Sequence, residues 1–339
     1  MSVVRTGVRN LITDVPGIAV GNAADERMRS GVTVLLPATP CIAAVDIRGG
    51  GSGSRETALL DPAGMVQAVD AVVLSGGSAF GLDAAGAVMS WLAARDRGFA
   101  VGQAVVPIVP QAILFDLLNG GDKRAFRDPS GAGLPYRALA KTACDTAGPD
   151  FALGVSGAGH GAKAGSLKGG LGSVSAMLPG GVTVGALVVV NSHGETTFSD
   201  GVFRAWESET DDEFGGGVPT SASTPLPDPV AGMPGANTTL AVVATDLSLD
   251  RADALRVAVM AQDGLARAIR PVHTPFDGDT VFVLSTGARP AAESSAARTA
   301  ELSRLGAVAA DCVARSVARG VYEAATLGDM AGWKDRFGR

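Results

Sequence analysis

Two short runs of apolar residues constrain the fold most: Val182 to Val190 (VTVGALVVV) and Leu240 to Thr245 (LAVVAT). Strands that are apolar at nearly every position are typical of the centre of a sheet whose two faces are both covered. Glycine contributes 46 of the 339 residues and aromatic side chains only 5%. This composition favours closely packed layers joined by many turns over a helical bundle. The sequence therefore predicts a layered α/β protein.

The other periodic segments alternate between strand spacing and helix spacing. We expect four successive strands of one sheet near the N-terminus and a fifth strand further on, at Asn10 to Gly17, Ile18 to Asn22, Gly31 to Leu36, Cys41 to Ile47 and Val69 to Leu74. We expect helices at Ala84 to Arg95, Pro135 to Thr146, Leu249 to Ile269 and Ala296 to Ala325. Val105 to Leu118 is interpreted as a strand or an irregular core segment, and residues 205–236 as a mobile loop or linker.

The charge balance limits the classes of partner. The net charge is −6 and the isoelectric point is near 5.1, so we expect no nucleic-acid partner and no membrane partner. A small molecule or peptide is the expected substrate. The N-terminal residues lack the apolar core of a signal peptide, and no apolar run reaches the roughly 20 residues of a membrane span. A cytoplasmic location is expected.

The cysteines and histidines point to no cofactor. Cys41, Cys144 and Cys312 lie far apart and are odd in number, so we interpret them as buried thiols in a reducing compartment. The chain has three histidines and lacks the CxxC and HExxH motifs. Neither a metal nor an organic cofactor is expected.

The pair Asn237-Thr238 precedes the second apolar run and permits a specific reaction. The Thr238 hydroxyl can attack the carbonyl of Asn237, convert the amide to an ester and let water split the chain. The new N-terminal threonine would carry its nucleophile and its base together, because an α-amine has a pKa of roughly 8. The alternative interpretation is an Asn-Thr-Thr turn that leads into a strand.

Two glycine-rich stretches are candidate loops around a site. Residues 48–57 (RGGGSGSRET) are either a flexible linker or a lining of the site. Residues 154–172 contain Lys163 and Lys168 among small residues. Lysine is normally a solvated residue, so either of these two side chains is expected to point into a cleft, with an ordinary surface loop as the alternative.

Three more polar residues stand next to apolar runs. Asn191 follows the first run and either donates to an oxyanion or forms a hairpin turn. Asp277 and Asp279 flank a glycine just before a further apolar run. Two carboxylates at this spacing are suited to holding an N-terminal ammonium group, and a loop calcium site or a plain Asp-Gly turn are the alternatives.

Seven stretches in order along nearly the whole chain resemble peptidase family S58, the L-aminopeptidase/D-esterase group or P1 family, which includes the nylon-oligomer hydrolases. They are LITDVPGIAVGN with GVTVLLP, DIRGGGSGSRETALLDP, VDAVVLSGGSAFGLDAAGAVMSWL, GAGHGAKAGSLKGGLGS, GALVVVNSHGE, NTTLAVVATD and FDGDTVF. The resemblance implies an N-terminal-nucleophile hydrolase with a four-layer αββα sandwich. It implies one domain over residues 1–339 that cuts itself into a large subunit, 1–237, and a small subunit, 238–339, and a homo-oligomer of the cleaved pairs.

The resemblance also implies roles for individual residues. Thr238 matches the nucleophile and the cut follows Asn237, while Asn191 matches a residue that positions the nucleophile or stabilises the oxyanion. Asp277 and Asp279 match the Asp-x-Asp of the nylon-hydrolase branch. That branch has a lysine where this chain has Ser166, so Lys168 is taken as the site lysine, with Lys163 as the alternative. Some members have a tyrosine in place of Phe115, before the aspartate that matches Asp116.

The expected function is hydrolysis of amide bonds in short peptides, β-amino-acid amides or linear oligoamides through an acyl-threonine intermediate. Two alternatives from other classes stay open. One is a self-cleaving acyltransferase of the ornithine acetyltransferase type, and the other is a ligand-binding scaffold without enzymatic activity that never cuts itself.

Overall fold

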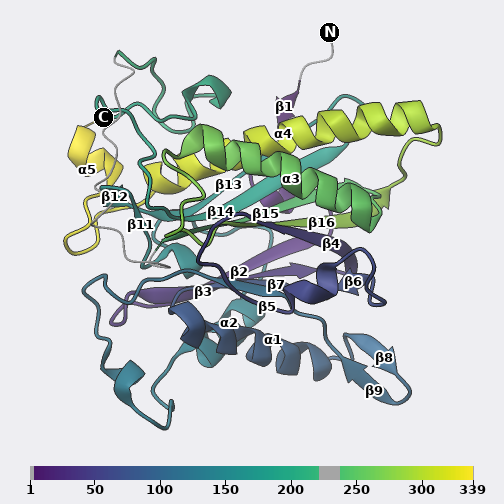
Figure 1. The fold of residues 1–339 in the computed structure, drawn as a ribbon, viewed down its shortest axis with the longest axis horizontal. Helices are drawn as coiled ribbons and strands as arrows, with labels where there is room; N and C mark the ends of the chain where they lie inside the picture. Colours follow the sequence, from purple (N-terminus) through teal and green to yellow (C-terminus); the bar gives the residue numbers. More distant parts are fainter. Residues whose placement is uncertain (1–3, 221–236, 339) are drawn as a thin grey trace.

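The computed structural model describes residues 4–220 and 237–338, and the chain forms four layers (Figure 1). Helices α3 (Arg251–Ala268) and α4 (Ser295–Tyr322) cover a seven-stranded sheet. A five-stranded sheet lies against the other face of that sheet, and α1 (Asp83–Ala93) and α2 (Tyr136–Asp145) cover its outer face. The predicted αββα sandwich is confirmed.

The seven-stranded sheet holds the two apolar runs at its centre. Its strands are, in spatial order, β1 (Arg5–Thr6), β13 (Gly170–Met177), β14 (Thr183–Asn191), β15 (Thr238–Leu247), β16 (Thr280–Arg289), β4 (Cys41–Ile47) and β6 (Ala68–Val69). Strands β15 and β16 are parallel and the other neighbours are antiparallel. Every residue of β14 and β15 is buried, as expected for strands covered on both faces.

The second sheet consists of β2 (Ile18–Asp25), β3 (Ser30–Pro37), β7 (Val72–Ser75), β10 (Gln111–Ile113) and β5 (Gly53–Arg55). Two separate hairpins are formed by β8 (Phe99–Val101) with β9 (Ala104–Val106) and by β11 (Lys163–Ala164) with β12 (Leu167–Lys168). The remaining helical segments are α5 (Trp333–Phe337) and the short 3-10 turns Ile12–Asp14, Thr57–Leu60, Ser78–Leu82, Arg124–Arg127, Gly157–Gly159 and Trp206–Ser208.

The predicted helices are all present, with ends shifted by one to three residues. The N-termini of α3 and α4 are capped by side chains: Asp250 accepts the N–H of Asp253 at 2.8 Å, and Ser294 accepts the N–H of Ala297 at 3.3 Å. A cap satisfies one of the free N–H groups of the first turn. These local hydrogen bonds therefore define where the two long helices begin.

Side-chain alternation along the central strands determines which residues face the space between the sheets. On β15, Ala241 and Val243 pack under the helices, whereas Leu240 and Val242 belong to the core between the two sheets. Alternate residues of a strand share a face, so Thr238 lies on the same face as Leu240. The same alternation on β14 places Asn191 on the face of Val189, which also belongs to the core between the sheets.

Two expectations about the first strands were wrong. Cys41–Ile47 does not continue the sheet of β2 and β3 but crosses to the seven-stranded sheet. Pro37 ends β3 and Pro40 lies between β3 and β4; a proline lacks the N–H group that a strand ladder needs. The expected strand from Asn10 contains a 3-10 turn instead, in which the Asp14 carboxylate accepts the N–H of Arg9 at 3.0 Å.

The predicted strand Val69–Leu74 is divided between both sheets. Val69 belongs to β6 and Val72 to Leu74 belong to β7, with Asp70 and Ala71 between the two strands. Asp70 stands at the break, where its carboxylate accepts the N–H of Ile108 at 2.8 Å. In the predicted mobile loop, residues 205–220 contain one 3-10 turn, and residues 221–236 lie outside the described residues.

The cysteine prediction is confirmed for the positions of the thiols. Cys41, Cys144 and Cys312 are buried free thiols, and burial raises the pKa of each to about 12. No helix within residues 4–220 and 237–338 has the length and apolar character required to cross a membrane.

Candidate active site

The site lies where β14 ends and β15 begins. The two strands are antiparallel, and their register pairs Asn191 with Thr238. The segment before β16 reaches the same place, because Asn237 and Asp277 form a parallel bridge just ahead of the β15–β16 ladder. Three segments that are distant in sequence therefore bring the predicted Asn, Thr and Asp residues together.

The carbonyl group of Asn237 has two polar neighbours. The Thr238 hydroxyl donates to its oxygen at 2.5 Å, and the main-chain N–H of Gly278 donates to the same oxygen at 2.9 Å. Thr238 is only 1% exposed. The bond between Asn237 and Thr238 thus has an internal hydroxyl beside its carbonyl group and an N–H donor already bonded to the oxygen.

Asp279 is held on both of its carboxylate oxygens. One oxygen accepts the main-chain N–H of Thr239 at 2.7 Å. The other accepts the main-chain N–H of His273 at 3.1 Å and lies 2.8 Å from Nδ1 of the same histidine. Asp279 therefore fixes the backbone one residue after the nucleophile candidate.

Asp277 is the second buried carboxylate of this pair. It accepts the N–H of Thr274 at 2.9 Å, the hydroxyl of Thr274 at 2.6 Å and the N–H of His193 at 3.2 Å. Burial raises the pKa of Asp277, and the neighbouring charge of Asp279 raises it further. A raised pKa in a buried carboxylate pair is typical of catalytic sites.

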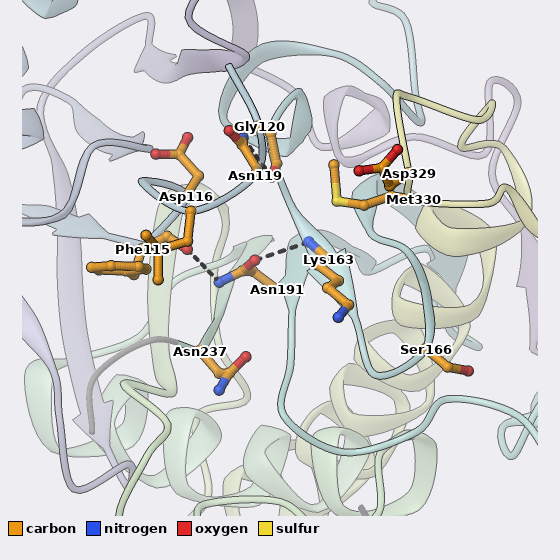
Figure 2. A pocket seen from close by; sticks show the side chains of 12 residues that line it. Phe115, Asp116, Asn119, Gly120, Lys163, Ser166, Asn191, Asn237, Asp329 and Met330 are labelled. Atoms are coloured by element: carbon orange, nitrogen blue, oxygen red, sulfur yellow. Dashed lines mark hydrogen bonds between the residues drawn. The ribbon is translucent and has the colours of Figure 1, made fainter. Parts of the chain in front are cut away.

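Asn191 is the last residue of β14, so the alternative of a hairpin turn at this position was wrong. Its side-chain oxygen accepts the main-chain N–H of Lys163 at 2.9 Å, and its side-chain nitrogen donates to the carbonyl of Phe115 at 3.1 Å (Figure 2). The side-chain amide of Asn191 is therefore held in one orientation, on the same face of the sheet as Thr238.

The two candidate lysines occupy different environments. Lys168 is fully buried, and its ammonium group donates to three main-chain carbonyls of its own loop rather than to the cluster around Thr238. Lys163 is exposed, and its side chain projects into a cavity next to Asn191 (Figure 2). The structure thus places Lys163 at the cavity and the ammonium group of Lys168 inside the loop of residues 159–169.

The first glycine-rich loop lines the site, and the flexible-linker alternative was wrong. Gly51 donates its N–H to the carbonyl of Asp277 at 2.8 Å, and Arg48 donates to the carbonyl of Asp279 at 3.0 Å. A Cβ atom at Gly49 would stand 2.3 Å from the carbonyl oxygen of Asp277. Only glycine permits this approach of two backbones.

A cavity of about 450 Å³ opens beside the Asn237–Thr238 bond. Figure 2 shows the side chain of Asn237 at one side of the residues that line it and those of Asp329 and Met330 at another. Its wall combines amide, charged and apolar groups, from Phe115, Asp116, Leu118, Asn119, Gly120, Gly161, Lys163, Ser166, Asn191, Asn237, Asp329 and Met330. Such a mixture suits a substrate with both polar and apolar parts.

Sequence reasoning missed three residues of the site. Gly278 supplies the donor to the Asn237 carbonyl, and His273 and Thr274 hold the two carboxylates. All three lie within seven residues of Asp279. A search for polar residues on either side of the two aspartates would have found His273 and Thr274. The donor of Gly278 is a main-chain N–H, which nearly every residue type has, so the sequence gives no indication of it.

Comparison with known proteins gives a family match over almost the whole chain. The model of peptidase family S58 matches residues 10–334. An uncharacterized aminopeptidase of Mycobacterium tuberculosis (strain ATCC 25618 / H37Rv) is 44% identical over 97% of this chain and 98% of its own. A 6-aminohexanoate-oligomer endohydrolase of Paenarthrobacter ureafaciens is 29% identical over 83% of this chain and 76% of its own.

Two solved structures show the same fold. The L-aminopeptidase D-Ala-esterase/amidase of Ochrobactrum anthropi, described as a variant of the Ntn hydrolase fold, superposes with a TM-score of 0.65 at 23% identity, over 94% of this chain and 88% of its own. A β-aminopeptidase of Burkholderia sp. has a TM-score of 0.66 at 22% identity, over 96% of this chain and 89% of its own.

Proposed function

The chain belongs to peptidase family S58 and is a hydrolase that acts on amide bonds, and from this premise we propose that it cuts itself between Asn237 and Thr238 and then hydrolyses substrates through an acyl-threonine intermediate. The observation that carries the proposal is the pair of contacts on one carbonyl. The Thr238 hydroxyl and the Gly278 N–H both reach the oxygen of Asn237.

Self-cleavage follows from these contacts as an acyl shift. The Thr238 oxygen attacks the carbonyl carbon of Asn237, and the C–N bond breaks as the hydroxyl proton passes to the released nitrogen. The chain is then joined for a time by an ester. The Gly278 N–H stabilises the negative charge that develops on the carbonyl oxygen. Water then hydrolyses the ester, which leaves Asn237 with a carboxylate and Thr238 with a free amine and its hydroxyl. The products are a large subunit, 1–237, and a small subunit, 238–339.

Substrate hydrolysis uses the same hydroxyl with a new base. The free α-amine of Thr238, with a pKa of roughly 8, accepts the hydroxyl proton as the oxygen attacks the substrate and passes it to the leaving amine. Water then releases the acyl group. Asp279 supports this step because its carboxylate fixes the N–H of Thr239, the residue bonded to the nucleophile.

The cavity supports a substrate of the amide class with a free amino end or a linear oligoamide backbone. Relatives of this chain include proteins named aminopeptidase and 6-aminohexanoate-oligomer endohydrolase. Carboxylates at Asp116 and Asp329 and the ammonium group of Lys163 stand beside the apolar side chains of Phe115 and Met330 in its wall. This arrangement offers partners for charged ends and for the methylene groups or side chains between them.

Assembly and location are further parts of the proposal. The family resemblance supports a homo-oligomer of cleaved pairs, and the three buried free thiols support a cytoplasmic protein. No nucleic-acid partner is proposed for a chain of net charge −6.

The test compares amide hydrolysis by the wild type, Thr238→Ala and the exposed control Thr142→Ala, with L-alanine p-nitroanilide and a linear 6-aminohexanoate oligomer as probes. Thr238→Ala should lose at least about a thousandfold in kcat/KM on every probe that the wild type cleaves, and Thr142→Ala should match the wild type. An active Thr238→Ala protein would overturn the proposal. Product that appears only when an amine acceptor such as ornithine is added would favour the acyltransferase.

A further inference from the structure

The buried ammonium group of Lys168 donates all of its N–H groups to carbonyls of its own loop. It donates to the carbonyls of Gly159 at 3.1 Å, Ala162 at 2.8 Å and Gly169 at 2.6 Å. An ammonium group has three donors, so each N–H has one carbonyl. The lysine closes the loop that runs from residue 159 to residue 169 around itself.

One of these carbonyls belongs to a peptide unit that also contacts the site. The carbonyl of Ala162 and the N–H of Lys163 are the two ends of a single planar peptide group. That N–H donates to the side-chain oxygen of Asn191 at 2.9 Å. Rotation of the peptide plane at one end must therefore move the donor at the other end.

Asn191 links the orientation of the 162–163 peptide to the bond between Asn237 and Thr238. Its side-chain nitrogen is bonded to the carbonyl of Phe115 at 3.1 Å, and its backbone is paired with Thr238 in the β14–β15 ladder. The amide is thus held between two main-chain groups. One of them belongs to the 162–163 peptide, whose carbonyl accepts from Lys168 at 2.8 Å and from the N–H of Gly169 at 3.0 Å.

We propose that Lys168 is a positioning residue: its ammonium group fixes the plane of the 162–163 peptide and, through that peptide, the side-chain amide of Asn191 beside Thr238. It does not touch the substrate. The effect on catalysis rests on the function proposed above, whereas the mechanical link between Lys168 and Asn191 does not.

The charge of Lys168 depends on pH in the accessible range. Burial lowers its pKa to about 7, and the nearby carboxylate of Asp116 opposes this shift. His160 is a second titratable neighbour: burial lowers its pKa, and the charge of Lys168 lowers it further. Lys163 is the cross-strand partner in the β11–β12 pair, with its side chain at the cavity. Loss of a proton leaves two N–H donors for three carbonyls, so the loop loses one hydrogen bond.

The mechanical link is tested in the uncut Thr238→Ala chain by following the 1H and 15N shifts of the Lys163 amide between pH 5.5 and 9. We expect both shifts to titrate with a midpoint near 7. In the double variant with Lys168→Met, the titration should be absent at all pH values. An amide that does not titrate, or that titrates equally in both proteins, would overturn the proposal.

A second variant keeps the test decisive if Lys168→Met does not fold. Asp116→Asn removes the carboxylate that favours the ammonium form, and an asparagine oxygen can still accept the N–H of Gly77 that Asp116 accepts at 2.8 Å. The midpoint of the Lys163 amide should move to lower pH. An unchanged midpoint would contradict the role of Lys168 in the titration.

The catalytic consequence is measured as the rate of self-cleavage between pH 6 and 9. Lys168→Met should slow it about 10- to 100-fold and remove the part of the pH dependence centred near 7, while the surface control Lys141→Met should behave as the wild type. Wild-type rates with an unchanged pH profile in Lys168→Met would exclude a positioning role. If no protein cleaves itself but the amide titration is as expected, the proposed function fails and the link from Lys168 to Asn191 stands.

Discussion

The main-chain N–H of Gly278 is bonded to the carbonyl oxygen of Asn237 at 2.9 Å. Because a donor of this kind is already oriented toward the oxygen, it needs little rearrangement as negative charge develops there. Removing one such donor in enzymes that form oxyanions costs about 3–4 kcal/mol of barrier. In the proposed self-cleavage, this contact gives the segment Asp277 to Asp279 a part in the reaction besides its support of strand β16.

Gly278→Ala should slow self-cleavage at least tenfold. A Cβ atom at this position would stand 2.6 Å from the Thr238 hydroxyl oxygen, so either the hydroxyl or the 277–279 segment must shift. Gly148→Ala is the matched control, because a Cβ atom there meets nothing within 4 Å. The fraction of uncut chain against time, read on a denaturing gel, gives both rates. Equal rates of self-cleavage in the two variants would show that the contact between Gly278 and Asn237 does not contribute to the reaction.

Asp279→Asn should also slow self-cleavage, by about 10- to 100-fold. The carboxylate accepts the N–H of Thr239 and two groups of His273, and hydrogen bonds to a charged group contribute about 1.5–3 kcal/mol each. The exposed Asp263→Asn on α3 controls for the change of charge. The same gel assay applies, and wild-type kinetics in Asp279→Asn would mean that the carboxylate does not orient the nucleophile.

The continuous apolar character of β14 and β15 was enough to predict two central strands and a layered α/β protein. The two apolar runs, the capped helices and the polar residues at strand ends all carry local signals. Asn191 and Thr238 could be identified because each stands at the junction of an apolar run with a polar segment.

The assignment of strands to sheets could not be predicted in the same way. Cys41–Ile47 has the composition of its neighbours, and only the long-range pairing with β16 decides that it leaves their sheet. The environment of Lys168 was equally inaccessible, because its partners are carbonyl oxygens, which every residue has. The donor at Gly278 was missed for the same reason.

Lys168 should make stability depend on pH. Its pKa is lowered from 10.5 to about 7 in the folded chain, so between these values the unfolded chain holds a proton that the folded chain has released. The free energy of unfolding should therefore rise with pH in this window, by up to about 1.4 kcal/mol per unit, and be independent of this group below about pH 7.

Urea unfolding of the uncut Thr238→Ala chain at pH 7.5 and 9.0, with and without Lys168→Met, measures this effect. The protein with lysine should gain about 1–2 kcal/mol relative to the protein with methionine over that interval. If the difference in the free energy of unfolding between the two proteins is the same at pH 7.5 and 9.0, the pKa of Lys168 is not lowered into this range.

The central claim is that Thr238 becomes an N-terminal residue. Denaturing mass spectrometry and N-terminal sequencing of the purified wild type, with Thr238→Ala beside it, test this most directly. The wild type should give two chains, 1–237 and 238–339, the second beginning Thr-Thr-Leu, and Thr238→Ala should give one intact chain. A wild-type protein that hydrolyses amides while every molecule remains a single uncut chain would contradict the account.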